Sequence, residues 1–277
     1  MTPTAIDSHA HVFVRGLPLD AGRRHEPDHD ATLADYLALL DAHGISHGVL
    51  VQPSFLGTDN RFLRAALRAR ADRLRGVAVV DASIDDAALR GLDDDGVRGI
   101  RLNLIGRPAP DLEGADWRRL FARVRALDWH VEVHAESQRL GAIAAPVLAA
   151  GCALVVDHFG RPSVVPPSQD PGFAWLLGAA THDRVWVKLS AAYRNAAPTQ
   201  ADAVAVDAAQ ALCAAFGAER LVWGSDWPHT QHRDVADFAS AHAALVAWVP
   251  DADARRRILV DTPARLFKFQ RGDSHAE

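Results

Sequence analysis

The chain has 277 residues, of which 49% are hydrophobic and 23% are charged, a composition typical of folded globular proteins. The net charge of -5 argues against a nucleic-acid-binding protein, which needs a basic surface. No apolar run reaches the ~20 residues of a membrane span, and the two cysteines, Cys152 and Cys213, cannot form a disulfide framework. We therefore expect a cytoplasmic protein with no nucleic-acid or membrane partner.

Short runs rich in β-branched residues alternate along the chain with Ala- and Leu-rich amphipathic stretches. The eight expected strands are residues 5–13, 48–53, 75–81, 97–104, 129–136, 153–159, 185–190 and 221–227. This alternation predicts a parallel sheet, and eight such units in one chain most economically close into a single (β/α)8 TIM-like barrel. An open doubly wound sheet is the alternative, but it needs a glycine-rich loop where this chain reads HAHVFVRG. We expect the barrel domain to span residues 1–270, followed by a tail over residues 271–277.

Helix starts are marked by polar residues. Thr32 and Asp35 have the spacing of a capping box before YLALLDAH, and Gly44 is expected to end that helix. Asp116 is the expected cap of WRRLFARVRAL, and Ser137 that of the next helix.

Histidines and one aspartate fall at strand ends, where a barrel carries its functional side chains. His9 and His11 are two positions apart on the first expected strand, so both point to the same face. His134 closes the fifth strand and Asp226 lies in the eighth. Three imidazoles and one carboxylate suit zinc or manganese and leave a position for water. These residues predict one divalent metal ion, bound by His9, His11, His134 and Asp226.

Two further strand ends carry residues suited to catalysis. Asp226, in LVWGSDWPH, could deprotonate a water as a general base, or it could only cap its loop. His158 ends a buried apolar run, where an imidazole is costly without a partner. Its neighbour Asp157 is expected on the opposite face, in a structural role.

Arginines are the second signal. Four of them lie on or just after expected strands: Arg101, Arg107, Arg161 and Arg194. A guanidinium at the rim of a net-acidic barrel suggests a bound carboxylate, which it can bind through two hydrogen bonds. Four suggest a small molecule with more than one carboxylate. Ser54, in QPSFLGTDN, could add a hydrogen bond to this molecule, or it could belong to a loop that caps a helix.

The segments IDSHAHVF, VQPSFLGTDN, GVRGIRLN, VDHFGRP and WGSDWPH together resemble the amidohydrolase superfamily. They are most similar to its amidohydrolase-related branch, which contains 2-pyrone-4,6-dicarboxylate lactonases and sulfomuconolactone hydrolases. The resemblance runs from residue 5 to about residue 268. It implies a (β/α)8 barrel that hydrolyses a carboxylated lactone in the breakdown of aromatic compounds.

The resemblance also implies residue roles. His9, His11 and His158 would surround the lactone carbonyl, Asp226 would be the general base, and the four arginines would hold the carboxylates. Pyrone lactonases work without metal and tend to have a tyrosine where this chain has His134, whereas sulfomuconolactone hydrolases depend on zinc. His134 therefore favours a zinc site. The alternative is catalysis without metal, with His134 contacting the substrate in the pocket.

Other functions stay open on the same scaffold. A metal-dependent decarboxylase would use the same histidines and aspartate, and a sugar-acid lactonase would need fewer carboxylate contacts. A barrel that only binds anions would have no use for a metal-ligand set beside a general base.

Overall fold

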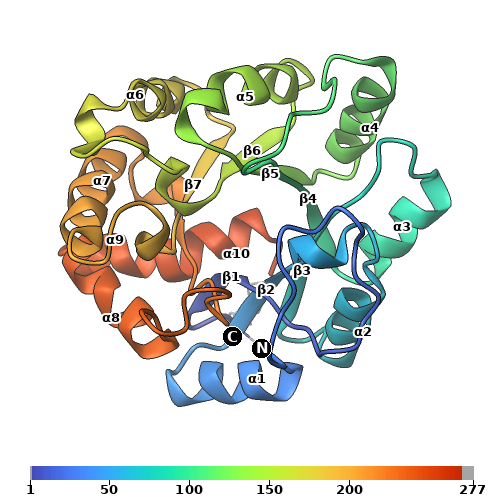
Figure 1. The fold of residues 1–277 in the computed structure, drawn as a ribbon, viewed down its shortest axis with the longest axis horizontal. Helices are drawn as coiled ribbons and strands as arrows, with labels where there is room; N and C mark the ends of the chain where they lie inside the picture. The colour runs from blue at the N-terminus through green and yellow to red at the C-terminus, as the bar shows by residue number, and fades with distance from the viewer. Residues whose placement is uncertain (1, 270–277) are drawn as a thin grey trace, which may run out of the picture.

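The computed structural model describes residues 2–269, in which eight parallel strands pair in sequence order (Figure 1). The strands are β1 (Ile6–Ala10), β2 (His47–Val51), β3 (Leu74–Ala78), β4 (Val97–Asn103), β5 (His130–His134), β6 (Ala153–Val156), β7 (Val185–Leu189) and β8 (Leu221–Trp223). The predicted (β/α)8 barrel is confirmed. All eight strands are shorter than predicted, because the apolar runs continue into loops after the strand pairing has ended.

Backbone hydrogen bonds between the first and last strands close the barrel. The Asp226 N–H donates to the His9 carbonyl and the His11 N–H donates to the Trp227 carbonyl, each at 2.8 Å. An isolated parallel bridge pairs Ala10 with Trp227. This seam lies just beyond β8 and brings His9, His11 and Asp226 to one place.

Helices surround the strands as an outer ring (Figure 1). They are α1 (Leu33–Ala42), α2 (Arg61–Ala69), α3 (Asp86–Asp94), α4 (Ala115–Ala126), α5 (Leu140–Ala149), α6 (Pro171–Gly178), α7 (Ala201–Phe216), α8 (Phe238–Trp248), α9 (Ala252–Arg256) and α10 (Thr262–Leu266). The capping box of Thr32 and Asp35 is confirmed. The other two predicted caps are wrong: α4 begins after Gly114, with Asp116 in its first turn, and the Ser137 hydroxyl donates to Asp170 instead.

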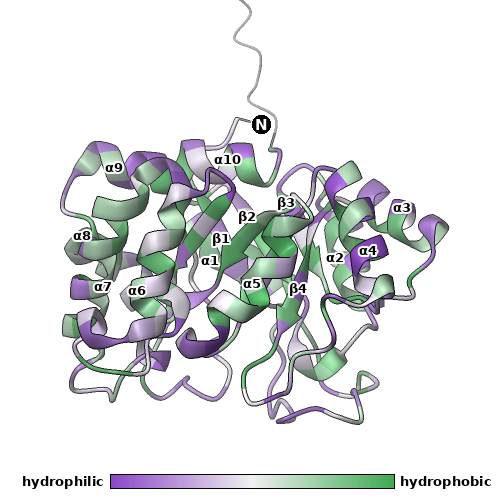
Figure 2. Cartoon of the chain, turned by 90° about the horizontal axis from the view of Figure 1, so that it is seen from above, coloured by the Kyte–Doolittle hydropathy of each residue, from purple (hydrophilic) through white to green (hydrophobic). Residues whose placement is uncertain are grey.

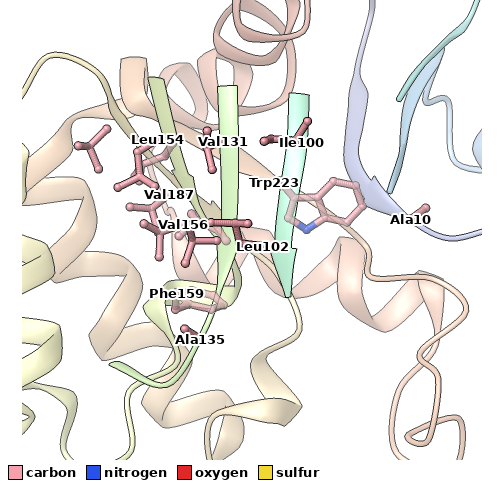
Figure 3. Packing of buried hydrophobic residues seen from close by; sticks show 14 of the residues in the cluster. Ala10, Ile100, Leu102, Val131, Ala135, Leu154, Val156, Phe159, Val187 and Trp223 are labelled. Carbon is pink, nitrogen blue, oxygen red and sulfur yellow. The ribbon is translucent and has the colours of Figure 1, made fainter. Parts of the chain in front are cut away.

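Alternation along the strands separates two kinds of interior. Outward-facing residues such as Ile100, Leu102 and Val131 are buried in the main hydrophobic cluster, shared with the helices (Figure 3). Figure 2 shows hydrophobic colour concentrated on the central strands and hydrophilic residues on the outer faces of helices. A second apolar cluster includes Ile6 of β1 and Phe267, which follows α10. Toward the carboxyl ends of the strands, the side chains inside the barrel are mostly polar.

Among residues 2–269, no helix combines the length and apolar character needed to cross a bilayer. The predicted tail, residues 271–277, lies outside the described residues.

Candidate active site

Three imidazoles surround one carboxylate oxygen where the barrel closes. The Nε2 atoms of His9, His11 and His158 lie 3.5, 3.6 and 3.9 Å from Asp226 Oδ1. The other nitrogens of two rings are anchored at 2.8 Å: His11 Nδ1 contacts the Val51 carbonyl and His158 Nδ1 contacts the Ser190 hydroxyl. These contacts aim the Nε2 atoms at Asp226.

Burial keeps the imidazoles of His9 and His158 uncharged. His9 and His158 are at most 1% exposed. Loss of hydration lowers the pKa of His158 to about 3, and burial together with the nearby Lys188 charge lowers the pKa of His9 well below its usual value. Neutral imidazoles offer lone pairs at neutral pH, as metal binding or proton transfer requires.

Asp226 is held as a carboxylate with one oxygen free. Its Oδ2 accepts hydrogen bonds from the Tyr193 hydroxyl at 2.5 Å and from Arg194 Nε at 2.9 Å. Burial alone would raise the pKa of Asp226, but the Arg194 charge and the neighbouring histidines hold it well below its usual range. The backbone of Asp226 is left-handed, with φ 58°, which turns the side chain away from the line of β8.

The side chains at this centre are of the types that bind metal ions, and two of their buried polar atoms have no hydrogen-bond partner. One donor atom from each of His9, His158 and Asp226 lies within 4.8 Å of the others. His9 Nε2 and Asp226 Oδ1 are buried with no hydrogen-bond partner, an arrangement a bound cation would satisfy. The chain therefore has histidine and aspartate groups that could hold a divalent ion.

His134 is placed differently from its prediction as a ligand beside Asp226. The structure groups it with Asp157 and His158, and its ring lies 4.7 Å from that of His158. His158 instead occupies the place next to Asp226. The reason is the turn after β6, where His158 has a φ of 51° and leaves the strand direction.

Asp157 also lies inside the barrel, so its expected place on the opposite face is wrong. Asp157 is still extended, with φ -73° and ψ 151°, so it is in phase with Val155, and alternation breaks only at His158, with φ 51°. Asp157 Oδ2 accepts hydrogen bonds from Arg101 Nε and Nη2 at 3.0 and 2.8 Å.

Asp157 belongs to a buried charged layer beside His9. The layer contains Arg101, Glu132, Asp157 and Lys188, each at most 4% exposed. Lys188 pairs with Glu132, and its Nζ lies 3.0 Å from His9 Nδ1. Arg101 Nε lies 3.1 Å from Glu132 Oε1. Two cations thus face two carboxylates.

The role predicted for Arg101 changes accordingly. Its guanidinium lines the pocket but is bound to two acidic side chains of the chain itself. Sequence reasoning missed Glu132, although HVEVH places it in phase with His134 on β5.

A pocket opens over this centre. Its lining includes His11, Arg24, His25, Ser54, Arg101, His134, His158, Arg161, Arg194 and Asp226. Ser54, Arg161 and Arg194 therefore line the pocket, as does His134, whose alternative expected role was a substrate contact; Arg194 also pairs with Asp226. Arg107 is not in the lining, because its guanidinium donates to the Gly22 carbonyl.

Arg24 and His25 were missed. They lie in the long loop after β1, which has no periodicity from which a direction could be predicted. Within residues 2–269, neither Arg24 nor Arg161 forms an ion pair. Arg24 donates only to the Ile105 carbonyl and the Asn103 side-chain oxygen. Arg161 donates to the Arg194 carbonyl and Asn195, and its Nε is buried without a partner.

Known proteins share this architecture over nearly the whole chain. A 2-pyrone-4,6-dicarboxylate hydrolase of Comamonas testosteroni is 33% identical, with 95% of this chain and 90% of that protein covered. A 4-sulfomuconolactone hydrolase of Rhizobium radiobacter is 34% identical, with coverages of 95% and 89%. A solved structure from Pseudomonas putida, provisionally described as a 2-pyrone-4,6-dicarboxylic acid hydrolase, is 48% identical with a TM-score of 0.92, covering 98% of this chain and 99% of that one.

The family model described as amidohydrolase matches residues 6–269, which include every strand of the barrel and every residue of the centre. The resemblance inferred from the sequence motifs is thereby confirmed. The chain belongs to the amidohydrolase family.

Proposed function

We propose that the chain is a hydrolase that opens the ring of a small lactone carrying at least two anionic groups. The observation that carries the proposal is the convergence of three imidazole Nε2 atoms on Asp226 Oδ1, in a pocket that also holds two arginines without acidic partners. Relatives named as hydrolases of a pyrone dicarboxylate and of a sulfomuconolactone support it. Breakdown of aromatic compounds in the cytoplasm belongs to the same proposal.

Asp226 is the proposed general base. Its lowered pKa keeps it ionised, and Oδ1 is free to take a proton from a water that attacks the ring carbonyl. The new bond joins the water oxygen to the carbonyl carbon, and the ring carbon–oxygen bond then breaks. Asp226 returns the proton to the departing oxygen, which balances the reaction.

His158 is the proposed stabiliser of the oxyanion. When the Ser190 hydroxyl donates to Nδ1 of this neutral imidazole, the proton lies on Nε2, which can donate to the carbonyl oxygen as negative charge develops. His9 lies beside Asp226 and polarises the same carbonyl, whereas His11, whose Nδ1–H donates to the Val51 carbonyl, presents an Nε2 lone pair.

A divalent ion, with zinc as the proposed metal, would be held here by His9, Asp226 and a third imidazole. His11, whose Nε2 lies 3.6 Å from Asp226 Oδ1, suits that third position, while His134 completes the set expected from the sequence and His158 keeps its Nε2 proton for the substrate. When bound, the ion would lower the pKa of a coordinated water toward ~7. Without it, Asp226 takes the proton from water directly.

Arg161 is the proposed contact for one substrate carboxylate, helped by Ser54 and His134 in the same lining. Burial and the nearby Arg194 charge lower the pKa of Arg161 to about 10, so it remains charged at neutral pH. Arg194 acts mainly through Asp226, which it orients.

The test is the initial rate of ultraviolet absorbance loss with 2-pyrone-4,6-dicarboxylate, measured on enzyme treated with and without a chelator. Turnover that survives chelation supports hydrolysis without metal, and turnover lost on chelation and restored by zinc supports the metal site. Failure to hydrolyse either this compound or a muconolactone would contradict the proposal.

A further inference from the structure

The loop between β1 and α1 reaches across the mouth of the pocket. Its two ends are joined by hydrogen bonds between Phe13 and Ala31, at 2.8 and 2.9 Å. Its middle is fixed to the loop after β2, where the Asp20 N–H donates to the Phe55 carbonyl at 2.8 Å. The loop is thereby held in place without a strand or helix of its own over the pocket.

Arg24 extends from this loop to the opposite rim. Its Nη1 donates to the Ile105 carbonyl at 3.0 Å and its Nη2 donates to Asn103 Oδ1 at 3.2 Å, both in or after β4. Both acceptors are neutral, so they orient the guanidinium and leave its charge uncompensated. Partial burial lowers the pKa of Arg24, and the charges of Arg101, Arg107 and Arg194 lower it further.

Of the four arginines that line the pocket, two are paired with carboxylates of the chain and two are not. Arg101 faces Asp157 and Glu132, and Arg194 faces Asp226. Arg24 and Arg161 have no such carboxylate among residues 2–269. The nearby Glu136 is held by Arg139 at 2.7 Å. Two unpaired guanidiniums in one pocket match a ligand with two negative charges.

We propose that Arg24 is a specificity-determining residue of this site and binds the second anionic group of the substrate, at the mouth of the pocket. The inference rests on the proposed function and extends it. Arg161 is half-buried and lies beside Arg194 and Asn195, close to the reacting centre, whereas Arg24 is exposed at the rim. The first carboxylate therefore binds Arg161, and Arg24 distinguishes a dianionic lactone from a singly charged one.

The same loop supplies a matched control. Arg23 is the preceding residue, but it pairs with Glu26 at 3.0 Å and does not line the pocket. The variants are Arg24→Met, Arg24→Lys and Arg23→Met. Isothermal titration calorimetry measures binding of benzene-1,3-dicarboxylate, which is not hydrolysed, and of benzoate, which has one carboxylate. Steady-state rates are measured in parallel with pyrone substrates carrying two carboxylates or one.

Arg24→Met is expected to weaken binding of the dicarboxylate at least tenfold and to change benzoate binding less than twofold. Arg24→Lys should recover part of the loss, and Arg23→Met should bind both compounds like the wild type. With the pyrones, KM should rise for the dicarboxylate alone.

Equal losses for both probes, or no loss for either, would overturn the role of Arg24. If Arg23→Met weakened dicarboxylate binding as much as Arg24→Met, the role of Arg24 would also be overturned, because the whole loop would have changed. These outcomes concern binding, so they stay distinct from failure of the proposed function, in which the wild type would hydrolyse no lactone at all.

Discussion

Two groups of charged side chains in the same barrel differ in how their charge is balanced. The buried layer sets Arg101 and Lys188 against Glu132 and Asp157. In the pocket, Arg24 at the rim and Arg161 nearer the reacting centre donate only to neutral acceptors within residues 2–269. A buried charge needs a partner from the chain to be tolerated at all, whereas a charge at a pocket can be left for a ligand to match. The pairing of a charge thus separates a structural arginine from one suited to recognition.

The largest expected effect is on stability and comes from breaking the buried layer. Lys188→Met leaves Glu132 and Asp157 with one cation between them, and the free energy of unfolding should fall by about 3–5 kcal/mol. Urea denaturation followed by circular dichroism measures it. Lys268→Met is the control, because Lys268 is half-buried and pairs with an exposed Asp128; its loss should be below ~1 kcal/mol. Similar losses of unfolding free energy in both variants would contradict the difference between buried and exposed ion pairs.

Asp226→Asn tests the carboxylate that contacts both His9, beside the buried layer, and Arg194, in the pocket. The amide cannot accept the proton of water, so kcat should fall by about 100- to 10,000-fold. Far-ultraviolet circular dichroism should show the fold retained. A rate within tenfold of the wild type would rule out Asp226 as the general base.

Arg161→Met removes an unpaired cation from the pocket. One lost charge-assisted hydrogen bond, about 1.5–3 kcal/mol, corresponds to a rise in KM of roughly 10- to 100-fold for a carboxylated lactone. The matched control is Arg107→Met, since Arg107 donates to the Gly22 carbonyl outside the lining. It should change KM less than twofold. Equal effects would mean that both arginines meet the substrate, as the sequence motifs imply.

The smallest effect is a change in pH dependence. His130 is buried with neither ring nitrogen bonded, and burial, together with the Lys188 charge, lowers its pKa to about 3. Because unfolding raises that pKa toward 6.5, this histidine contributes stability above pH 6.5 and loses it as the pH falls toward 3. His130→Met should reduce the slope of unfolding free energy against pH by about 1.4 kcal/mol per unit near pH 5. An unchanged slope, measured by urea denaturation at several pH values, would contradict the assignment.

Strand periodicity was enough to predict the barrel and much of its centre. His9, His11 and Asp226 lie at the ends of the first and last strands, so a parallel barrel brings them together whatever the detailed geometry. Arg161, Arg194 and Ser54 follow strand ends closely enough to be placed at the pocket.

The misplaced residues share a different cause. Asp157 keeps an extended backbone one residue beyond β6 and so still points inward, and the left-handed residues begin only at His158. Arg107 and Arg24 belong to loops whose side chains are directed by contacts with other loops, and those contacts join residues about 80 positions apart, with separations of 85 and 81 in sequence. A single sequence carries no local signal for such pairings.

The seam between the first and last strands also has a consequence for how the enzyme is made. Asp7 Oδ1 accepts a hydrogen bond from the Ser225 N–H at 2.8 Å, across 218 positions of the chain. His9 and His11 are synthesised well before their carboxylate partner, Asp226. No nascent chain that stops before residue 226 can contain the centre, so chemical competence is delayed until the barrel can close.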